Sequence, residues 1–194
     1  QRAAEMLAGG AVGGAFDISR EPMKVRERYG APSWGQQALL SRRLAEVGVP
    51  YTLVNFNLNQ KTGQDWDNHS NIFNVMKTKL LPPTDRAISA LLDDLEERGL
   101  LDSTLLAVYG EFGRTPKIND KGGRDHWNQV CSVMLAGGGL KRGVVVGSST
   151  KAGDVPKDRP TPFNDILATM YRQMGVPTDQ VFHDVLGRPF PYLP

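Results

Sequence analysis

The chain has 194 residues, of which 40% are hydrophobic and 23% charged, and its 23 basic and 21 acidic residues leave a formal net charge of +2. This composition is typical of a globular domain with a core, and the small charge excess, without any block of like charge, argues against nucleic acid or an anionic membrane as a partner. No apolar run reaches the roughly 18 residues of a membrane-spanning helix, no signal peptide is visible, and a single cysteine, Cys131, excludes an intramolecular disulfide.

The N-terminal part of the chain predicts little regular structure before residue 36. Residues 1–35 combine a short segment that could be helical with small, polar and turn-forming residues, so we expect an irregular segment. Leucines at helical spacing then predict a helix over 36–47, with Gly48 as its stop. Residues 51–57 are rich in β-branched and aromatic types, which predicts a strand.

The second half of the chain alternates between apolar helices and strands. The clearest helix follows Pro83, with Thr84 or Asp85 as its N-cap and Gly99 as its stop. Strands are expected over 103–110, 129–139 and 143–149. A last helix with Thr161 as N-cap runs to about residue 174.

This alternation favours the α/β class. Continuous apolar strands are typical of a mostly parallel sheet that is covered by helices on both faces. We therefore expect one domain over residues 1–194, without internal repeats.

Two long polar loops follow the first two predicted strands. Ligands of open α/β sheets gather at the carboxyl ends of the strands, so both loops are expected at one edge of the sheet. The loops contain these candidates: Asp65, Asp67, His69, Glu111, Arg114, Arg124, Asp125 and His126.

The mixture of carboxylates and imidazoles suits a divalent ion such as zinc or manganese. Asp67 and His69 are two residues apart, so both side chains can point the same way in an extended loop. Asp125 and His126 are adjacent. They would bind different ions, or one would be a ligand and the other an orienting partner.

Each candidate also has a purely structural interpretation. His69 could cap the turn that follows it, and Asp125 with His126 could form an ion-paired turn with Arg124. Glu111 could pair with Arg114, although a carboxylate at the end of an apolar strand would be costly to bury unpaired.

Four blocks of the sequence resemble a known family. They are YTLVNFN…WDNHSNIF, LLDDLEERGLLDSTLLAVYGEFGRTPKIN, GGRDHWNQVCSVMLAGGGLKRGVVVGSS and RPTPFNDILATMYRQMGV. They are similar to the sulfatase-like family catalogued as a domain of unknown function, DUF 1501, which is assigned to the alkaline phosphatase superfamily. The resemblance runs from about Phe16 to the end of the chain.

The resemblance implies an alkaline phosphatase-like three-layer α/β/α sandwich that holds one or two metal ions, with zinc foremost. Asp67, His69 and His126 match the metal ligands of the superfamily and Glu111 stands at another ligand position, so we expect a metal site of Asp67, His69, Glu111, Asp125 and His126. In it, Glu111 and Asp125 are ligands or partners that orient a ligand. Arg114 or Arg124 would bind the anionic oxygens of an ester, because a guanidinium matches their geometry. Phe112 stands where many members of the superfamily have a histidine ligand, and the nucleophile found early in those chains has no counterpart here. The chain is therefore expected to be the C-terminal part of a longer member.

The functional expectation is a metal-dependent hydrolase of sulfate or phosphate esters, with sulfated polysaccharide among its candidate substrates. The family also implies a periplasmic or secreted location. The alternative is a non-catalytic binding module, or an inactive fragment, that uses the same fold without the nucleophile.

Overall fold

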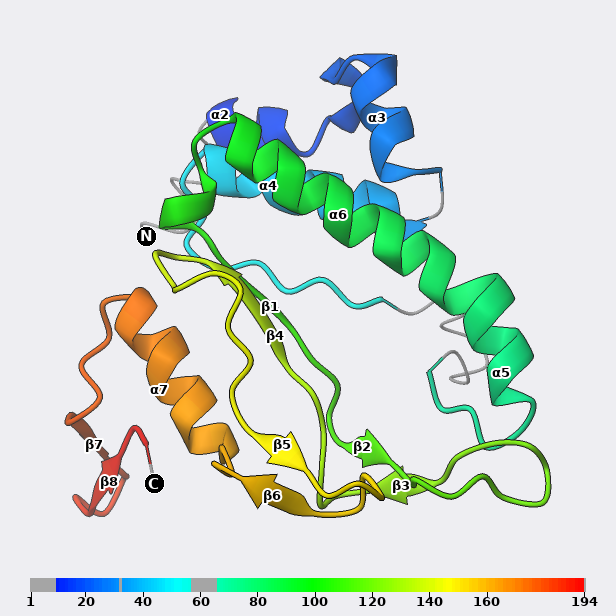
Figure 1. Cartoon of the computed structure of the whole chain (residues 1–194). Coiled ribbons are helices and arrows are strands. Elements are labelled where there is room, and N and C mark those ends of the chain that lie inside the picture. Colours follow the sequence, from blue (N-terminus) through cyan, green and yellow to red (C-terminus); the bar gives the residue numbers. More distant parts are fainter. Residues whose placement is uncertain (1–9, 32, 57–65, 194) are drawn as a thin grey trace. The chain divides into compact units, whose positions relative to one another are not determined.

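The computed structural model describes residues 10–31, 33–56 and 66–193 (Figure 1). Contacts divide the chain into two compact units. Unit 1 comprises Gln1–Thr104 and Lys117–His126, and unit 2 comprises Leu105–Pro116 and Trp127–Pro194. The single domain expected from the sequence stays a prediction.

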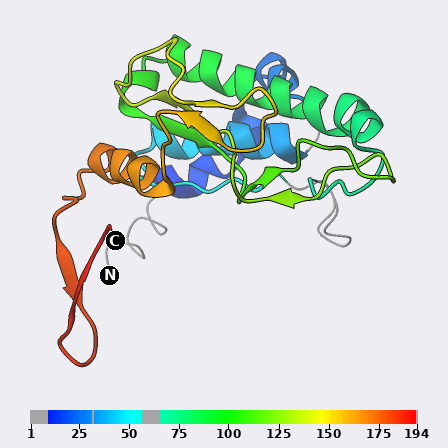
Figure 2. The ribbon, with the colours of Figure 1, turned by 60° about the horizontal axis from the view of Figure 1, so that its bottom comes forward.

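Unit 1 is built from helices. In chain order they are α2 (Gly10–Ala15), the 3₁₀ turn η1 (Ile18–Arg20), α3 (Met23–Tyr29), α4 (Ser33–Glu46), α5 (Ile72–Val75), the π-helical turn η2 (Met76–Leu80), α6 (Leu81–Glu97) and the 3₁₀ turn η3 (Leu101–Ser103). Helices α4 and α6 pack side by side, as two directions of view show (Figures 1 and 2). Their apolar stripes bury Trp34, Leu39 and Leu95 almost completely, which forms the core of this unit.

Two predicted helix stops are confirmed. Gly48 and Gly99 both adopt positive φ, at 82° and 67°. The amide of Val49 donates to the carbonyl of Leu44 at 2.9 Å, and that of Leu100 donates to Leu95 at 2.8 Å. These 6→1 bonds are the signature of the Schellman motif, which needs a left-handed residue that glycine adopts without strain.

The predicted start of α6 is wrong. Neither Thr84 nor Asp85 caps the helix, which instead continues η2 and begins at Leu81. Pro82 and Pro83 occupy its first turn and carry no amide hydrogen, so two backbone bonds to the preceding turn cannot form. That loss accounts for the wider π-helical turn immediately before them.

A buried ionic cluster joins three segments of unit 1. The side chain of Arg42 is fully buried, and it lies 2.9 Å from both Glu21 and Asp94. The hydroxyl of Tyr29 donates to Asp94 at 2.8 Å, and Arg98 contacts the same carboxylate at 2.7 Å. Such a cluster fixes the register of α3, α4 and α6, because every charge in it depends on the others for compensation.

Unit 2 contains the remaining helix, α7 (Phe163–Gln173), and most of the short strands. The strands of the chain are β1 (Leu105–Val108), β2 (Gly113–Arg114), β3 (His126–Trp127), β4 (Met134–Gly137), β5 (Ser148–Ser149), β6 (Pro156–Asp158), β7 (Val181–His183) and β8 (Pro189–Pro191). In the described part of the chain they form only two-stranded sheets: β1–β4, β2–β3, β5–β6 and β7–β8.

The predicted mostly parallel three-layer α/β/α sandwich is therefore wrong. The longest ladder, β1 with β4, is antiparallel and pairs Leu105 with Gly137 and Val108 with Met134. Parallel neighbours need a crossover, usually a helix, and the structure has no helix between these two strands. The described residues of the expected strand at 51–57, which are 51–56, form no regular structure and supply no third strand.

The N-terminal region also differs from expectation. Helices α2 and α3 lie within residues 10–35, where an irregular segment was expected, whereas the possible helix at 1–8 lies outside the described residues. Among the described helices, none combines the length and apolar character needed to cross a bilayer.

Candidate metal centre

Two distant segments of unit 1 are joined by backbone hydrogen bonds. The amides of Asn71 and Ile72 donate to the carbonyls of Lys121 and Gly122, at 3.1 and 3.0 Å. The amide of Arg124 donates back to Asn68 at 3.1 Å. This pairing, and not a shared sheet edge, brings the loop that holds Asp67 and His69 against the turn that leads to His126.

Gly123 permits this close approach. A Cβ atom on Gly123 would overlap the carbonyl group of His69 and the nitrogen of Ser70. Only a residue without a side chain lets the two backbones lie at this distance. The Gly-Gly pair before the Arg-Asp-His stretch is thus part of what positions the histidine.

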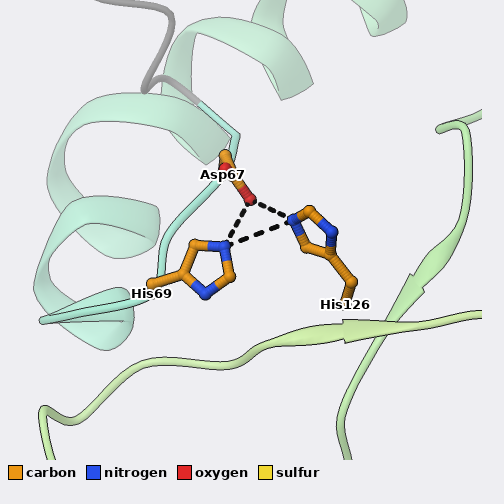
Figure 3. Close-up of side chains that lie close together, drawn as sticks. All are labelled: Asp67, His69 and His126. Atoms are coloured by element: carbon orange, nitrogen blue, oxygen red, sulfur yellow. Dashed lines mark hydrogen bonds and ion pairs between the residues drawn. The ribbon is translucent and has the colours of Figure 1, made fainter.

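Asp67, His69 and His126 converge at one point (Figure 3). One oxygen of Asp67, Oδ1, lies 2.9 Å from Nε2 of His69 and 2.8 Å from Nε2 of His126. The two Nε2 atoms are 3.2 Å apart. The three ligand atoms come from positions up to 59 residues apart in the chain.

The convergence fits a divalent cation. Zinc–nitrogen and zinc–oxygen bonds of about 2.0–2.2 Å on a tetrahedral ion place neighbouring ligand atoms roughly 3.2–3.5 Å apart. The two oxygen–nitrogen separations, 2.9 and 2.8 Å, are shorter than this, and the nitrogen–nitrogen separation of 3.2 Å lies at the lower end of the range. All three atoms can offer a lone pair to the same point. Two imidazoles and one carboxylate also leave room for a fourth ligand, as catalytic zinc sites require.

The three side chains are accessible to solvent. Their exposed fractions are 43% for Asp67, 42% for His69 and 51% for His126. Ion pairs at such exposure contribute little to folding stability. The cluster is therefore better explained by binding than by a contribution to the core.

Asp125 contacts the other nitrogen of a ligand ring. Its Oδ1 lies 2.6 Å from Nδ1 of His69. Asp125 is not one of the three residues whose ligand atoms converge in the described part of the chain, which are Asp67, His69 and His126. The hydrogen bond with the His69 ring, opposed by some desolvation and helped by a bond from Asn119, holds the pKa of the Asp125 carboxyl below its usual value. With a cation bound, an ionised carboxylate at this place would accept the Nδ1–H of His69 and leave Nε2 as the ligand atom.

The other predicted residues have different surroundings. Glu111 and Arg114 belong to unit 2 and are not members of the converging group. The guanidinium carbon of Arg114 lies 5.5 Å from the centroid of the Phe112 ring. Arg124 belongs to unit 1 and holds Asn68 through its backbone amide, whereas Asp65 lies outside the described residues.

Sequence reasoning missed Asn119. Its side-chain amide donates to the carbonyl of His69 at 3.1 Å and to Oδ1 of Asp125 at 3.2 Å. An open cavity of about 420 Å³ beside this contact is lined by His69, Asn119, Asp120, Lys121 and Asp125. The letters Asn-Asp-Lys-Gly-Gly indicate a turn, but no local signal links that turn to His69, 50 residues away.

Comparison with known proteins supplies a family. Searches of curated proteins and of solved structures found no match. A family scan matches residues 1–193, almost the whole chain, to the family described as "Protein of unknown function (DUF1501)". Because this match covers nearly all of the sequence, the chain belongs to the DUF1501 family.

Proposed function

We propose that this chain binds a divalent metal ion through Asp67, His69 and His126, and that the centre serves the hydrolysis of sulfate or phosphate esters. The observation that carries the proposal is the convergence of Oδ1 and two Nε2 atoms within 3.2 Å of one another. The ester-hydrolysis part rests on the sequence resemblance to the sulfatase-like proteins of the alkaline phosphatase superfamily. Zinc is the first candidate ion.

The chain's own residues would prepare the site in three ways. Asp67 supplies a negative charge that both imidazole rings face, which offsets the charge of a bound cation. Asp125 retains the proton on Nδ1 of His69, which orients that ring. Backbone pairing of the two loops holds His126 in place before any ligand arrives.

A bound zinc ion would act as a Lewis acid and polarise an oxygen of the ester. Arg124, which belongs to the same unit as the triad, is the candidate for binding the remaining anionic oxygens, because a guanidinium matches the geometry of a sulfate or phosphate group. The roles expected for Glu111 and Arg114, which belong to unit 2, stay predictions from the sequence.

The test is metal analysis of the purified protein together with a matched pair of histidine variants. Wild-type protein is stripped with a chelator and titrated with zinc by calorimetry, and the protein as purified is analysed for zinc, manganese and iron. We expect one equivalent of zinc to bind and His126→Ala to weaken binding at least 100-fold. His183→Ala is the control, since His183 lies in β7 of unit 2 and outside the triad.

Absence of metal binding in the wild type, or equal binding in both variants, would refute the metal centre. Zinc binding without hydrolysis of p-nitrophenyl sulfate or p-nitrophenyl phosphate would favour the non-catalytic binding module. Because two histidines and one carboxylate with an open side also hold Fe(II) in oxygenases, iron in the purified protein would redirect the proposal toward oxygen chemistry.

A further inference from the structure

One side chain contacts both segments that meet at the triad. The amide nitrogen of Asn119 donates to the carbonyl of His69 and to Oδ1 of Asp125. Its carbonyl oxygen accepts from the backbone amides of Lys121 and Gly123, at 3.0 and 2.9 Å. Asn119 therefore uses both ends of its side chain, one to shape its own turn and one to hold the residues beside a candidate ligand.

The backbone of Asn119 closes the same turn. Its amide donates to the carbonyl of Gly123 at 2.9 Å, and its carbonyl accepts from Gly122 at 3.0 Å. The turn so formed presents the carbonyls of Lys121 and Gly122 to Asn71 and Ile72. The contacts of one residue thus fix both the position of His69 and the turn that precedes Asp125 and His126.

The contact with Asp125 has a chemical consequence as well as a geometric one. Oδ1 of Asp125 lies 2.6 Å from Nδ1 of His69 and 3.2 Å from Nδ2 of Asn119. Two contacts to one oxygen restrict how the carboxylate can turn and favour the orientation in which it accepts the Nδ1 proton of His69. Residues that orient a metal-binding histidine in this way typically change metal affinity about 10–100-fold when they are replaced.

We propose that Asn119 is a positioning residue of the metal centre, which sets the tautomer and orientation of His69 through Asp125 and through the backbone carbonyl of His69. This inference rests on the proposed metal centre. It adds a residue that contacts no ligand atom of the triad and acts only through its neighbours.

The decisive variant is Asn119→Asp. It keeps oxygen acceptors for the amides of Lys121 and Gly123, so the turn is retained. It replaces the donor with a second carboxylate beside Asp125. Asn74→Asp is the matched control, because it makes the same chemical change on the exposed surface of α5 in the same unit. Asn119→Ala, which removes acceptor and donor together, separates loss of the turn from loss of the donor.

Two measurements are made on each protein. Zinc titration by calorimetry is expected to show a dissociation constant about 10–100-fold larger in Asn119→Asp than in wild type, and an unchanged one in Asn74→Asp. Nitrogen-15 NMR of the metal-free proteins reports which ring nitrogen of His69 carries the proton. Wild type and Asn74→Asp are expected to show a proton on Nδ1 that is hydrogen-bonded to Asp125, and Asn119→Asp is expected to lose the signal of that hydrogen-bonded proton.

The outcomes separate this inference from the proposed function. A wild type that binds no zinc refutes the metal centre, and the NMR measurement then decides whether Asn119 positions the ring. A wild type that binds zinc, with unchanged affinity and an unchanged tautomer in Asn119→Asp, overturns the inference and leaves the metal centre in place. If the metal-free Asn119→Asp protein melts within about 2–3 °C of wild type, the loss of zinc affinity is local to the site. A loss of affinity that merely follows global unfolding overturns the positioning role.

Discussion

At the scale of single residues, the candidate site depends on which atom of each side chain faces its neighbours. His69 faces a carboxylate at each ring nitrogen, Asp125 at Nδ1 and Asp67 at Nε2, at 2.6 and 2.9 Å. A neutral ring has one N–H and one lone pair, so a ring that donates from Nδ1 to Asp125 turns the lone pair of Nε2 toward Asp67, and a cation bound by both atoms would satisfy them. Asp125 is therefore interpreted as an orienting partner and not as a fourth ligand.

We predict that Asp125→Asn weakens zinc binding about 10-fold or more, since a neutral amide accepts the Nδ1 proton of His69 less strongly than a carboxylate does. Zinc calorimetry of the stripped protein measures the change. Asp120→Asn is the control, because Asp120 lines the same cavity and carries the same charge. Equal losses in the two variants would assign the effect to net charge and contradict the orienting role.

At the scale of elements, the site depends on two loops that lie against each other through their backbones. Neither loop is a regular strand, and their contact is one isolated antiparallel bridge, Ser70 with Gly122, flanked by the backbone bonds of their neighbours. The start of α5 takes part in this contact, since the amide of Ile72 donates to the carbonyl of Gly122 in the facing loop. Any residue that separates the loops should separate the ligands.

Gly123→Ala is expected to abolish high-affinity zinc binding, because the added methyl group would overlap the backbone of His69 and Ser70. Gly13→Ala is the control. Gly13 lies in α2 of the same unit, and a Cβ atom there would meet no other atom within 4 Å. Zinc titration and circular dichroism would be compared for the two variants, and wild-type affinity in Gly123→Ala would show that the loops do not need this close contact.

At the scale of the whole molecule, helix packing in unit 1 is tied to the ionisation of buried acids. Burial is the largest influence on Asp94 and opposes its ionisation, but hydrogen bonds from Arg98 and Tyr29 and the charge of Arg42 lower the pKa of its carboxyl overall. The pKa of Glu21 is lowered in the same way, by Arg42 and Arg43 against the cost of burial. Removing one partner of such a cluster leaves an uncompensated charge, which costs about 3–5 kcal/mol.

The sign of the pH dependence follows from the lowered pKa. The stabilisation is fully present above the ordinary carboxyl pKa, 3.8 for Asp94, and is lost as the pH falls through the lower pKa of the folded state. We therefore predict that Asp94→Asn lowers the free energy of unfolding by about 3–5 kcal/mol at pH 7, and that the gap to wild type narrows below pH 4.

Urea unfolding at pH 7 and at pH 3 measures the gap. Asp93→Asn, one residue away on α6, is the control, since Asp93 is 62% exposed in its ion pair with Arg28 and should cost less than about 1 kcal/mol. Equal losses in the two variants at pH 7, or a gap that stays constant with pH, would contradict the role assigned to Asp94.

The three longest helices, α4, α6 and α7, were predictable from the sequence, whereas the short helices α2, α3 and α5 and the strand pairing were not. The stops at Gly48 and Gly99 follow from local backbone chemistry, and the leucine stripes of α4 and α6 follow from a period of 3.6 residues. The apolar stretch around β1 looks the same whether its neighbour runs parallel or antiparallel. Its actual partner, β4, lies beyond a long loop, and the direction of pairing depends on how that loop returns.

Residue types alone determined the candidates for this site: carboxylates and imidazoles, two residues apart at Asp67 and His69 and adjacent at Asp125 and His126. The tertiary structure decided which atoms meet. It groups Asp67 with His69 and His126, turns Asp125 to the far nitrogen of His69, and adds Asn119 as the link. The physical reason is the distance along the chain between the residues that make each contact. Helix periodicity and glycine stops are encoded within a few neighbouring residues, whereas the side-chain contacts between the two loops of this site join positions 50–59 apart and arise only when the loops dock.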